Sequence, residues 1–354
     1  LGAQVPVPSI AAVSVQQAMT FPRKQDFEIA EGYTYINAAF THPMPKVSME
    51  AVRRHAESRN RLGTPPAAAG APGGGGGGGG GARLDPKALF AEMIGAKPAE
   101  VAYVPNTSTG ENMVVNALGL DRKFDGNVVT DWLHYDGALV HLLELKKQGL
   151  DVRVVKPTKE FRIDIKDLEK VVDRNTKLIQ VSSIAMYNGF EHDLKAVCDL
   201  AHNVGAYVYA DIIHSAGAVP FDVKASGVDF AACSSFKWLM GDTGLGFIFA
   251  REDVLPKIAR SQIGYQQLSR MQGHFPPFDP EAENKPVTWE HRPDAKGHFE
   301  IGTMGGSLAA GLGASLQYIK ELGVANIQAH RVPLLRKLRE EVPKLKHGFV
   351  LVTP

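Results

Sequence analysis

The chain has 354 residues, of which 44% are hydrophobic and 22% charged, as in an ordinary globular protein with a large core. Its formal net charge is +1, so bulk electrostatics favours neither nucleic acid nor an anionic membrane as a partner. The two cysteines, Cys198 and Cys233, form no CxxC pair and indicate neither a disulfide framework nor a thiolate metal site.

The N-terminal segment from Leu1 to Met19 is weakly apolar and lacks a basic region, so it does not read as an intact signal peptide. We expect a cytoplasmic protein, with export after N-terminal processing as the alternative. No stretch of 18 or more apolar residues occurs, so no transmembrane helix is expected.

A low-complexity stretch at residues 65–82 contains the uninterrupted glycine run Gly73 to Gly81. Polyglycine has no side chain to bury and much backbone entropy to lose, which predicts a flexible surface loop. A phosphate-binding loop is disfavoured, because no Gly-Lys-Ser/Thr follows the run and no strand precedes it.

Short segments rich in Val and Ile then alternate with helical patterns. Strands are predicted at residues 101–104, 127–130, 152–155, 177–182, 206–211, 229–234 and 245–250. Helices are predicted at residues 110–120, 136–148 and 194–204, the last with Asp193 as a possible N-cap. This alternation predicts an α/β fold with a mostly parallel seven-stranded sheet, whose ligands bind beyond the carboxyl ends of the strands.

The C-terminal part contains two further helical patterns, at residues 307–322 and 324–342. The first is amphipathic and rich in small residues. A new strand is expected to begin at residues 351–354, where the chain stops.

Lys237 follows the predicted strand at 229–234 and precedes a glycine turn at residues 241–246. A lysine can form a Schiff base when its amine is partly neutral, although most lysines are simply exposed. Asp211 ends an earlier predicted strand, where it is either an ordinary turn residue or a carboxylate that needs a cationic partner. An amine for an aldehyde and an acid for a ring nitrogen suit pyridoxal 5'-phosphate (PLP).

Other candidate residues lie near predicted strand ends. His214 either contacts the phenolic oxygen of the cofactor or transfers a proton, or it is an ordinary polar histidine. Thr107 and Ser108 open a helix, where hydroxyl and backbone N–H groups bind phosphate or simply cap the helix. Tyr135 either stacks on a pyridine ring or belongs to the core.

The order Asp211-x-x-His214, then Ser234-Ser235-Phe236-Lys237-Trp238 and the glycine turn, resembles the class V aminotransferase family of fold-type I PLP enzymes. This family includes cysteine desulfurases and isopenicillin N epimerase-like proteins, and the resemblance covers residues 35–354. It implies that Lys237 forms a Schiff base with PLP, that Asp211 pairs with the ring nitrogen and that His214 lies beside the phenolic oxygen. It assigns the phosphate to Thr107, Ser108 and Ser234, and ring stacking to Tyr135, with His134 as an alternative alignment.

The resemblance also implies a domain organisation and an assembly. A PLP-binding large domain would span residues 46–305. A small domain would comprise an N-terminal arm at 1–45 and, after an interdomain helix, an incomplete C-terminal part within 306–354. The segment Phe299-Glu300-Ile301-Gly302-Thr303 resembles the one whose threonine reaches the phosphate of the neighbouring subunit, which implies a homodimer with shared sites.

Two departures from the family pattern limit the interpretation. Phe236 stands where many members have a histidine before the lysine, so one phosphate contact would be lost. The region that carries the substrate-carboxylate arginine and, in desulfurases, the catalytic cysteine is mostly absent from the chain.

We therefore predict a PLP-dependent enzyme that acts on an amino acid or amine, without nucleic-acid or membrane partners. The substrate amine would displace Lys237, which would then move the α-proton. Transamination leads because the resemblance is broad; cysteine desulfuration, C–S lysis and epimerisation are alternatives. A catalytically inactive scaffold is the alternative of another class, and the retention of both Lys237 and Asp211 argues against it.

Overall fold

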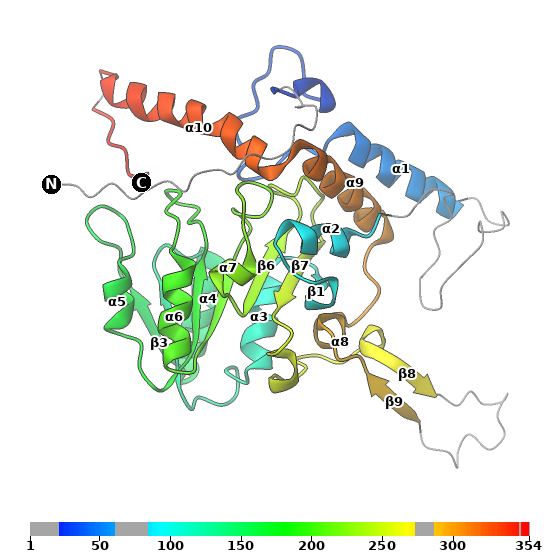
Figure 1. Ribbon diagram of the computed structural model, residues 1–354, viewed down its shortest axis with the longest axis vertical. Coiled ribbons are helices and arrows are strands. Elements are labelled where there is room, and N and C mark those ends of the chain that lie inside the picture. The colour runs from blue at the N-terminus through cyan, green and yellow to red at the C-terminus, as the bar shows by residue number, and fades with distance from the viewer. Residues whose placement is uncertain (1–20, 61–83, 273–286, 347, 354) are drawn as a thin grey trace.

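The computed structural model describes residues 21–60, 84–272, 287–346 and 348–353 (Figure 1). The segment Leu1 to Met19 and the glycine run lie outside the described residues, so the loop prediction stays a prediction. Residues 351–353 belong to no strand, contrary to the expected strand start there. Among the described helices, none is both long enough and apolar enough to cross a membrane.

The centre of the fold is a seven-stranded sheet in the order β1-β7-β6-β5-β4-β2-β3. The pairs among β2, β3, β4, β5 and β6 are parallel, and β7 is antiparallel to both β1 and β6. The strands are β1 (Val101–Val104), β2 (Asn127–Asp131), β3 (Asp151–Val155), β4 (Thr176–Ser182), β5 (Tyr207–Asp211), β6 (Phe230–Ser234) and β7 (Gly246–Ala250). The mostly parallel sheet is thus confirmed, with each strand boundary within one residue of its predicted position.

Three helices that connect these strands show how local side chains set helix ends. Helix α3 (Thr107–Ala117) begins three residues before its predicted start, because the Asn106 side chain accepts the Thr109 N–H at 2.8 Å and caps it. Helix α4 (Asp136–Gln148) has its predicted bounds. Helix α6 (Leu194–Asn203) is capped by Asp193, as predicted, through the N–H of Ala196.

Helices cover both faces of the sheet and bury an apolar layer on each. One layer receives side chains from α2 (Pro86–Met93), α6, α7 (Val223–Ser226) and α9 (Gly306–Leu322). The other receives them from α3, α4 and α8 (Ala295–Phe299). A short helix, α5 (Ile165–Glu169), follows β3.

Helix α1 (Lys46–Asn60) packs closely along α9, as Figure 1 shows. A Cβ atom on Gly311 would lie 2.7 Å from the Val52 side chain, so a glycine is needed at this crossing. Helix α10 (Val324–Glu341) follows α9 and has no buried residue among its described side chains.

A hairpin of β8 (Leu268–Gln272) and β9 (Thr288–His291) projects from the body of the fold (Figure 1). The sequence did not predict it, because its two strands are mostly exposed and lack a clear alternation of apolar and polar residues.

Candidate active site

The loops that follow β5 and β6 meet at the carboxyl edge of the sheet and bring Lys237 to His214. The Nζ atom of Lys237 lies 3.1 Å from Nε2 of His214, and both side chains are half-buried. Gly217 allows this approach: its φ is +83°, and a Cβ atom there would lie 2.6 Å from the carbonyl oxygen of Trp238.

Burial disfavours the positively charged forms of Lys237 and His214. Desolvation lowers the pKa of Lys237 from its ordinary value. Burial, together with the neighbouring charge of Lys237, lowers the pKa of His214 to about 4. His214 is therefore neutral near pH 7, and the fraction of Lys237 that is a nucleophilic amine is increased.

Asp211, the last residue of β5, is a buried carboxylate with an exposed fraction of 3%. Its Oδ1 atom accepts the N–H of Ile213 at 2.9 Å. Burial raises the pKa of this carboxyl to about 6, although the Ile213 N–H and, more weakly, the charges of His134 and Lys237 oppose the shift. Within the described parts of the chain, no Lys, Arg or His nitrogen lies within 4.0 Å of it, so its negative charge has no ion-pair partner.

Two hydroxyl groups link the start of α3 to the end of β6. Ser234 Oγ accepts the Thr107 N–H at 2.8 Å, Thr107 Oγ1 accepts the Ser234 N–H at 2.9 Å, and the two oxygens lie 2.9 Å apart. One hydroxyl hydrogen spans the oxygens, which leaves the other free to donate to an added anion. Ser108 lies on the same helical turn and is half-buried.

The alternatives for ring stacking differ sharply in exposure. Tyr135 occupies the N-cap position of α4 without a side-chain capping bond and is 39% exposed, whereas His134 is completely buried. His134 Nδ1 lies 2.8 Å from Ser182 Oγ, and its Nε2 lies 3.6 Å from the Glu111 carboxylate. Burial by itself would lower the pKa of His134. The interaction with the Glu111 carboxylate outweighs this effect, so the pKa of His134 is raised.

Glu111 is a charged residue near the site that sequence reasoning missed. It is 1% exposed in the interior of α3 and accepts a hydrogen bond from Gln180 on β4. A glutamate inside a helix is usually exposed, so no pattern in the sequence indicated this burial.

Within the described residues, no hydrogen bond joins Thr303 to the other predicted site residues. It is exposed between α8 and α9, and its hydroxyl bonds to the Tyr265 hydroxyl. Thr107, Asp211, His214, Ser234 and Lys237 therefore occupy one edge of the sheet, while Tyr135 and Thr303 present exposed side chains.

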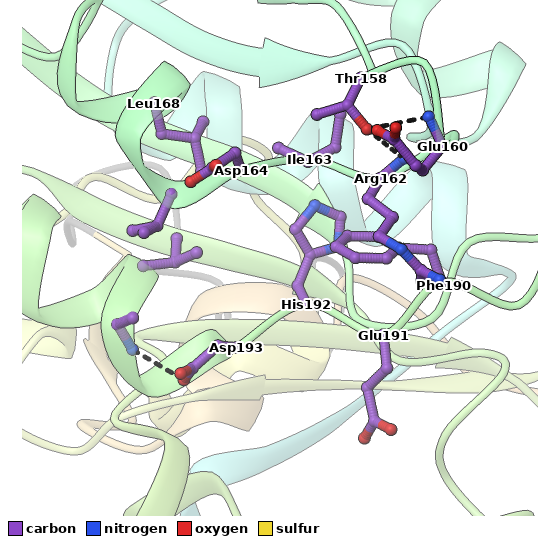
Figure 2. Close-up of a pocket in the computed structure, with 13 residues that line it drawn as sticks. Thr158, Glu160, Arg162, Ile163, Asp164, Leu168, Phe190, Glu191, His192 and Asp193 are labelled. Carbon is purple, nitrogen blue, oxygen red and sulfur yellow. Dashed lines mark hydrogen bonds between the residues drawn. The ribbon is translucent and has the colours of Figure 1, made fainter. Parts of the chain in front are cut away.

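A cavity of about 470 Å³ lies apart from these residues, between the loops that follow β3 and β4 (Figure 2). Its wall includes Arg162, Phe190 and His192, and none of the predicted site residues. His192 is tied to Asp131 at the end of β2 through Nε2, at 3.1 Å. Among the described residues, the Lys237 cluster (Lys237, His214 and Asp211) combines a suppressed amine charge with a buried carboxylate that has no ion-pair partner, so we expect the chemistry there rather than at this cavity.

Comparisons with known proteins bear on the family and the fold of this chain. The aminotransferase class-V family model matches residues 85–353. A probable cysteine desulfurase of Methanothermobacter thermautotrophicus is 28% identical over 323 residues, which cover 91% of this chain and 75% of that protein. A cysteine desulfurase of Haloferax volcanii is 29% identical over 244 residues, which cover 68% of this chain and only 54% of that protein.

Solved structures share the fold. The apo cysteine desulfurase from Thermococcus onnurineus NA1 has a TM-score of 0.74 at 22% identity, over 93% of this chain and 78% of that chain. The cystine C–S lyase C-DES, solved with its reaction product cysteine persulfide, has a TM-score of 0.70 at 19% identity, over 88% and 80% of the two chains. The predicted fold is therefore confirmed.

Proposed function

Because this chain belongs to the aminotransferase class V family, we propose that it is a PLP-dependent enzyme acting on the amino group of an amino acid or amine. The observation that carries the proposal is that one edge of the sheet holds both Lys237 and Asp211. Burial lowers the pKa of the Lys237 amine, and the buried Asp211 carboxylate has no ion-pair partner. These are the two groups that the aldehyde and the ring nitrogen of PLP require.

The residues present fit this cofactor. Lys237 would hold it covalently, and Asp211 would gain the cationic partner that its buried carboxylate lacks. The free hydroxyl hydrogen of the Thr107–Ser234 pair, at the N-terminus of α3, would donate to the phosphate, with Ser108 on the same turn. When bound, PLP supplies an electron sink for negative charge at the substrate α-carbon.

The protein side chains then handle the proton. With PLP and a substrate bound, the Lys237 amine would be the base for the substrate α-proton, because burial already lowers the pKa of Lys237. His214 lies 3.1 Å from that amine and orients it. Tyr135 remains the proposed stacking residue, since its exposed ring is accessible whereas that of His134 is enclosed.

Cleavage of a C–S bond in a cysteine-type substrate is the second candidate, and the names of the relatives favour it as the first reaction to test. The two cysteines of the chain are poor sulfur acceptors. Cys198 and Cys233 are both buried, and burial raises the pKa of Cys198 to about 12 and that of Cys233 above its ordinary value. We propose that neither of these two thiols accepts the sulfur that such a reaction releases.

Product analysis separates these reactions. The protein is incubated with PLP and cysteine, cystine or alanine, with and without a keto-acid acceptor, and sulfide, persulfide and new amino acids are measured. Sulfide or persulfide without an acceptor supports C–S cleavage, and acceptor-dependent amino acid formation supports transamination. No turnover of an extended amino acid and amine panel by PLP-loaded protein would reject the enzymatic proposal.

We further propose a homodimer in which Thr303 contacts the phosphate bound by the other subunit. The exposed position of Thr303, outside the Lys237 cluster, supports a contact made across an interface.

A further inference from the structure

The indole next to Lys237 makes a hydrogen bond of its own. Trp238 Nε1 donates to Nδ1 of His214 at 3.4 Å, and the other ring nitrogen of His214 faces Lys237 at 3.1 Å. An indole N–H can only donate, so Nδ1 must accept and carries no proton. A neutral imidazole with a bare Nδ1 carries its proton on Nε2.

We propose that Trp238 is a positioning residue that fixes His214 in the Nε2–H tautomer and so makes it a hydrogen-bond donor toward Lys237. An ammonium group has no lone pair with which to accept this bond, whereas a neutral amine has one. The tautomer therefore favours the nucleophilic form of Lys237. In the opposite tautomer, the Nε2 lone pair would face Lys237 and favour the ammonium.

Two distant segments hold the indole in this position. The Arg331 guanidinium of α10 lies 4.9 Å from the centre of the Trp238 ring and donates to the Ala218 carbonyl at 2.9 Å. On the N-terminal side, the centres of the His42 and Trp238 rings lie 6.1 Å apart. The backbone N–H of His42 donates to the Phe236 carbonyl at 2.9 Å. Arg331 thus holds the loop that contains His214, and His42 holds the loop that contains Trp238.

The charges around His214 are consistent with a neutral ring. Lys237 faces Nε2, and the cation of Arg331 lies beyond the indole that faces Nδ1. Neither neighbour stabilises an imidazolium, and the ring is largely desolvated, so it remains neutral across the pH range in which Lys237 must react.

Nuclear magnetic resonance tests the tautomer directly in the full chain without added cofactor. Long-range ¹H–¹⁵N correlations of ¹⁵N-histidine-labelled protein distinguish the two neutral forms, and the His214→Gln variant identifies the His214 signals. We expect the Nε2–H form in the native protein. In Trp238→Phe, which keeps a ring under Arg331 but removes the N–H, we expect a substantial fraction of the Nδ1–H form.

The reactivity of Lys237 gives a second readout. Its rate of acylation at pH 8, followed by peptide mass spectrometry, should fall about fivefold in Trp238→Phe, as expected for the loss of one ordinary hydrogen bond. The matched control is Trp289→Phe, because Trp289 lies exposed on β9. This control should change neither the tautomer nor the rate.

Only the catalytic consequence of the His214 tautomer rests on the proposed function. The results that would overturn the tautomer inference therefore differ from those that would reject the proposed function. An Nδ1–H form in the native protein would overturn the inference without any variant, even if Trp238→Phe failed to fold. An unchanged tautomer in folded Trp238→Phe would also overturn it. By contrast, native protein with the expected tautomer but no PLP binding would reject the proposed function and leave this inference standing.

Discussion

At the residue scale, the unpaired carboxylate of Asp211 links the site to the stability of the protein. Its pKa is raised by burial to about 6, so the folded protein binds this proton more tightly than the unfolded chain. Its contribution to stability is therefore fully present below the ordinary carboxyl pKa of about 4 and is lost as the pH rises through about 6. A cofactor with a cationic ring nitrogen would restore this lost stability by pairing with the ionised Asp211 carboxylate.

Replacing Asp211 by Asn tests this charge. The amide oxygen can still accept the Ile213 N–H, while the buried charge disappears. Cofactor-free Asp211→Asn should be more stable than the native protein at pH 8 by about 2–3 kcal/mol, and nearly equal to it at pH 4. Urea unfolding at both pH values measures this difference. The exposed Asp199→Asn is the control, and a native-like pH dependence in Asp211→Asn would contradict the burial argument.

The same change should weaken function. Asp211→Asn should retain some PLP but lose most turnover, because the ring nitrogen would no longer have an ionised partner. Near-normal turnover by this variant would reject the role of Asp211 at the ring nitrogen.

At the element scale, a buried chain of hydroxyls connects α1 and α9 to the turn after Lys237. Ser315 Oγ donates to the Met240 carbonyl at 2.7 Å, so Ser48 Oγ must donate to Ser315 Oγ, at 2.6 Å. Both serines are completely buried. These two hydrogen bonds connect α1 and α9 to the loop that carries Lys237.

Ser315→Ala should destabilise the protein by about 1–3 kcal/mol, because it leaves the Ser48 hydroxyl and the Met240 carbonyl without a partner. Ser48→Ala removes only the outer member and should cost less. The free energies of unfolding of both single variants and the double variant form a cycle, in which the double variant should cost less than the sum. Strict additivity would show that the two hydroxyls do not act together.

The elements themselves were largely predictable, for reasons that also explain the exceptions. The central strands are short, continuous apolar runs bounded by turn residues, so their composition and length identified them. The apolar pattern alone begins three residues after the start of α3, because the helix is capped by the Asn106 side chain, ahead of the first residue of that pattern. The exposed β8–β9 hairpin offered no buried face to predict.

At the scale of the whole molecule, the site depends on contacts between segments that are far apart in the sequence. Lys237, Asp211 and His214 could be proposed from strand ends and motif spacing. The partners that orient them could not, because nothing local indicates that Arg331 of α10 and His42 of the N-terminal arm meet at Trp238. The burial of Glu111 against His134 is another long-range contact of this kind.

The proposed assembly belongs to this scale as well. Analytical ultracentrifugation should give a mass of two chains for the native protein. Thr303→Val should leave that mass unchanged and weaken PLP binding about tenfold, the effect of losing one hydrogen bond to a charged group. Full PLP affinity in Thr303→Val, or in a monomeric native protein, would contradict a phosphate contact across the interface.

Covalent trapping tests most directly whether Lys237 holds the cofactor. Native protein, Lys237→Ala and the exposed-lysine control Lys224→Ala are incubated with PLP, reduced with borohydride, digested and mapped by mass spectrometry. We predict a stoichiometric pyridoxyl adduct on Lys237 in the native protein and in Lys224→Ala, and none at any site in Lys237→Ala. A stoichiometric adduct on another lysine, or no adduct on the native protein, would contradict this role of Lys237.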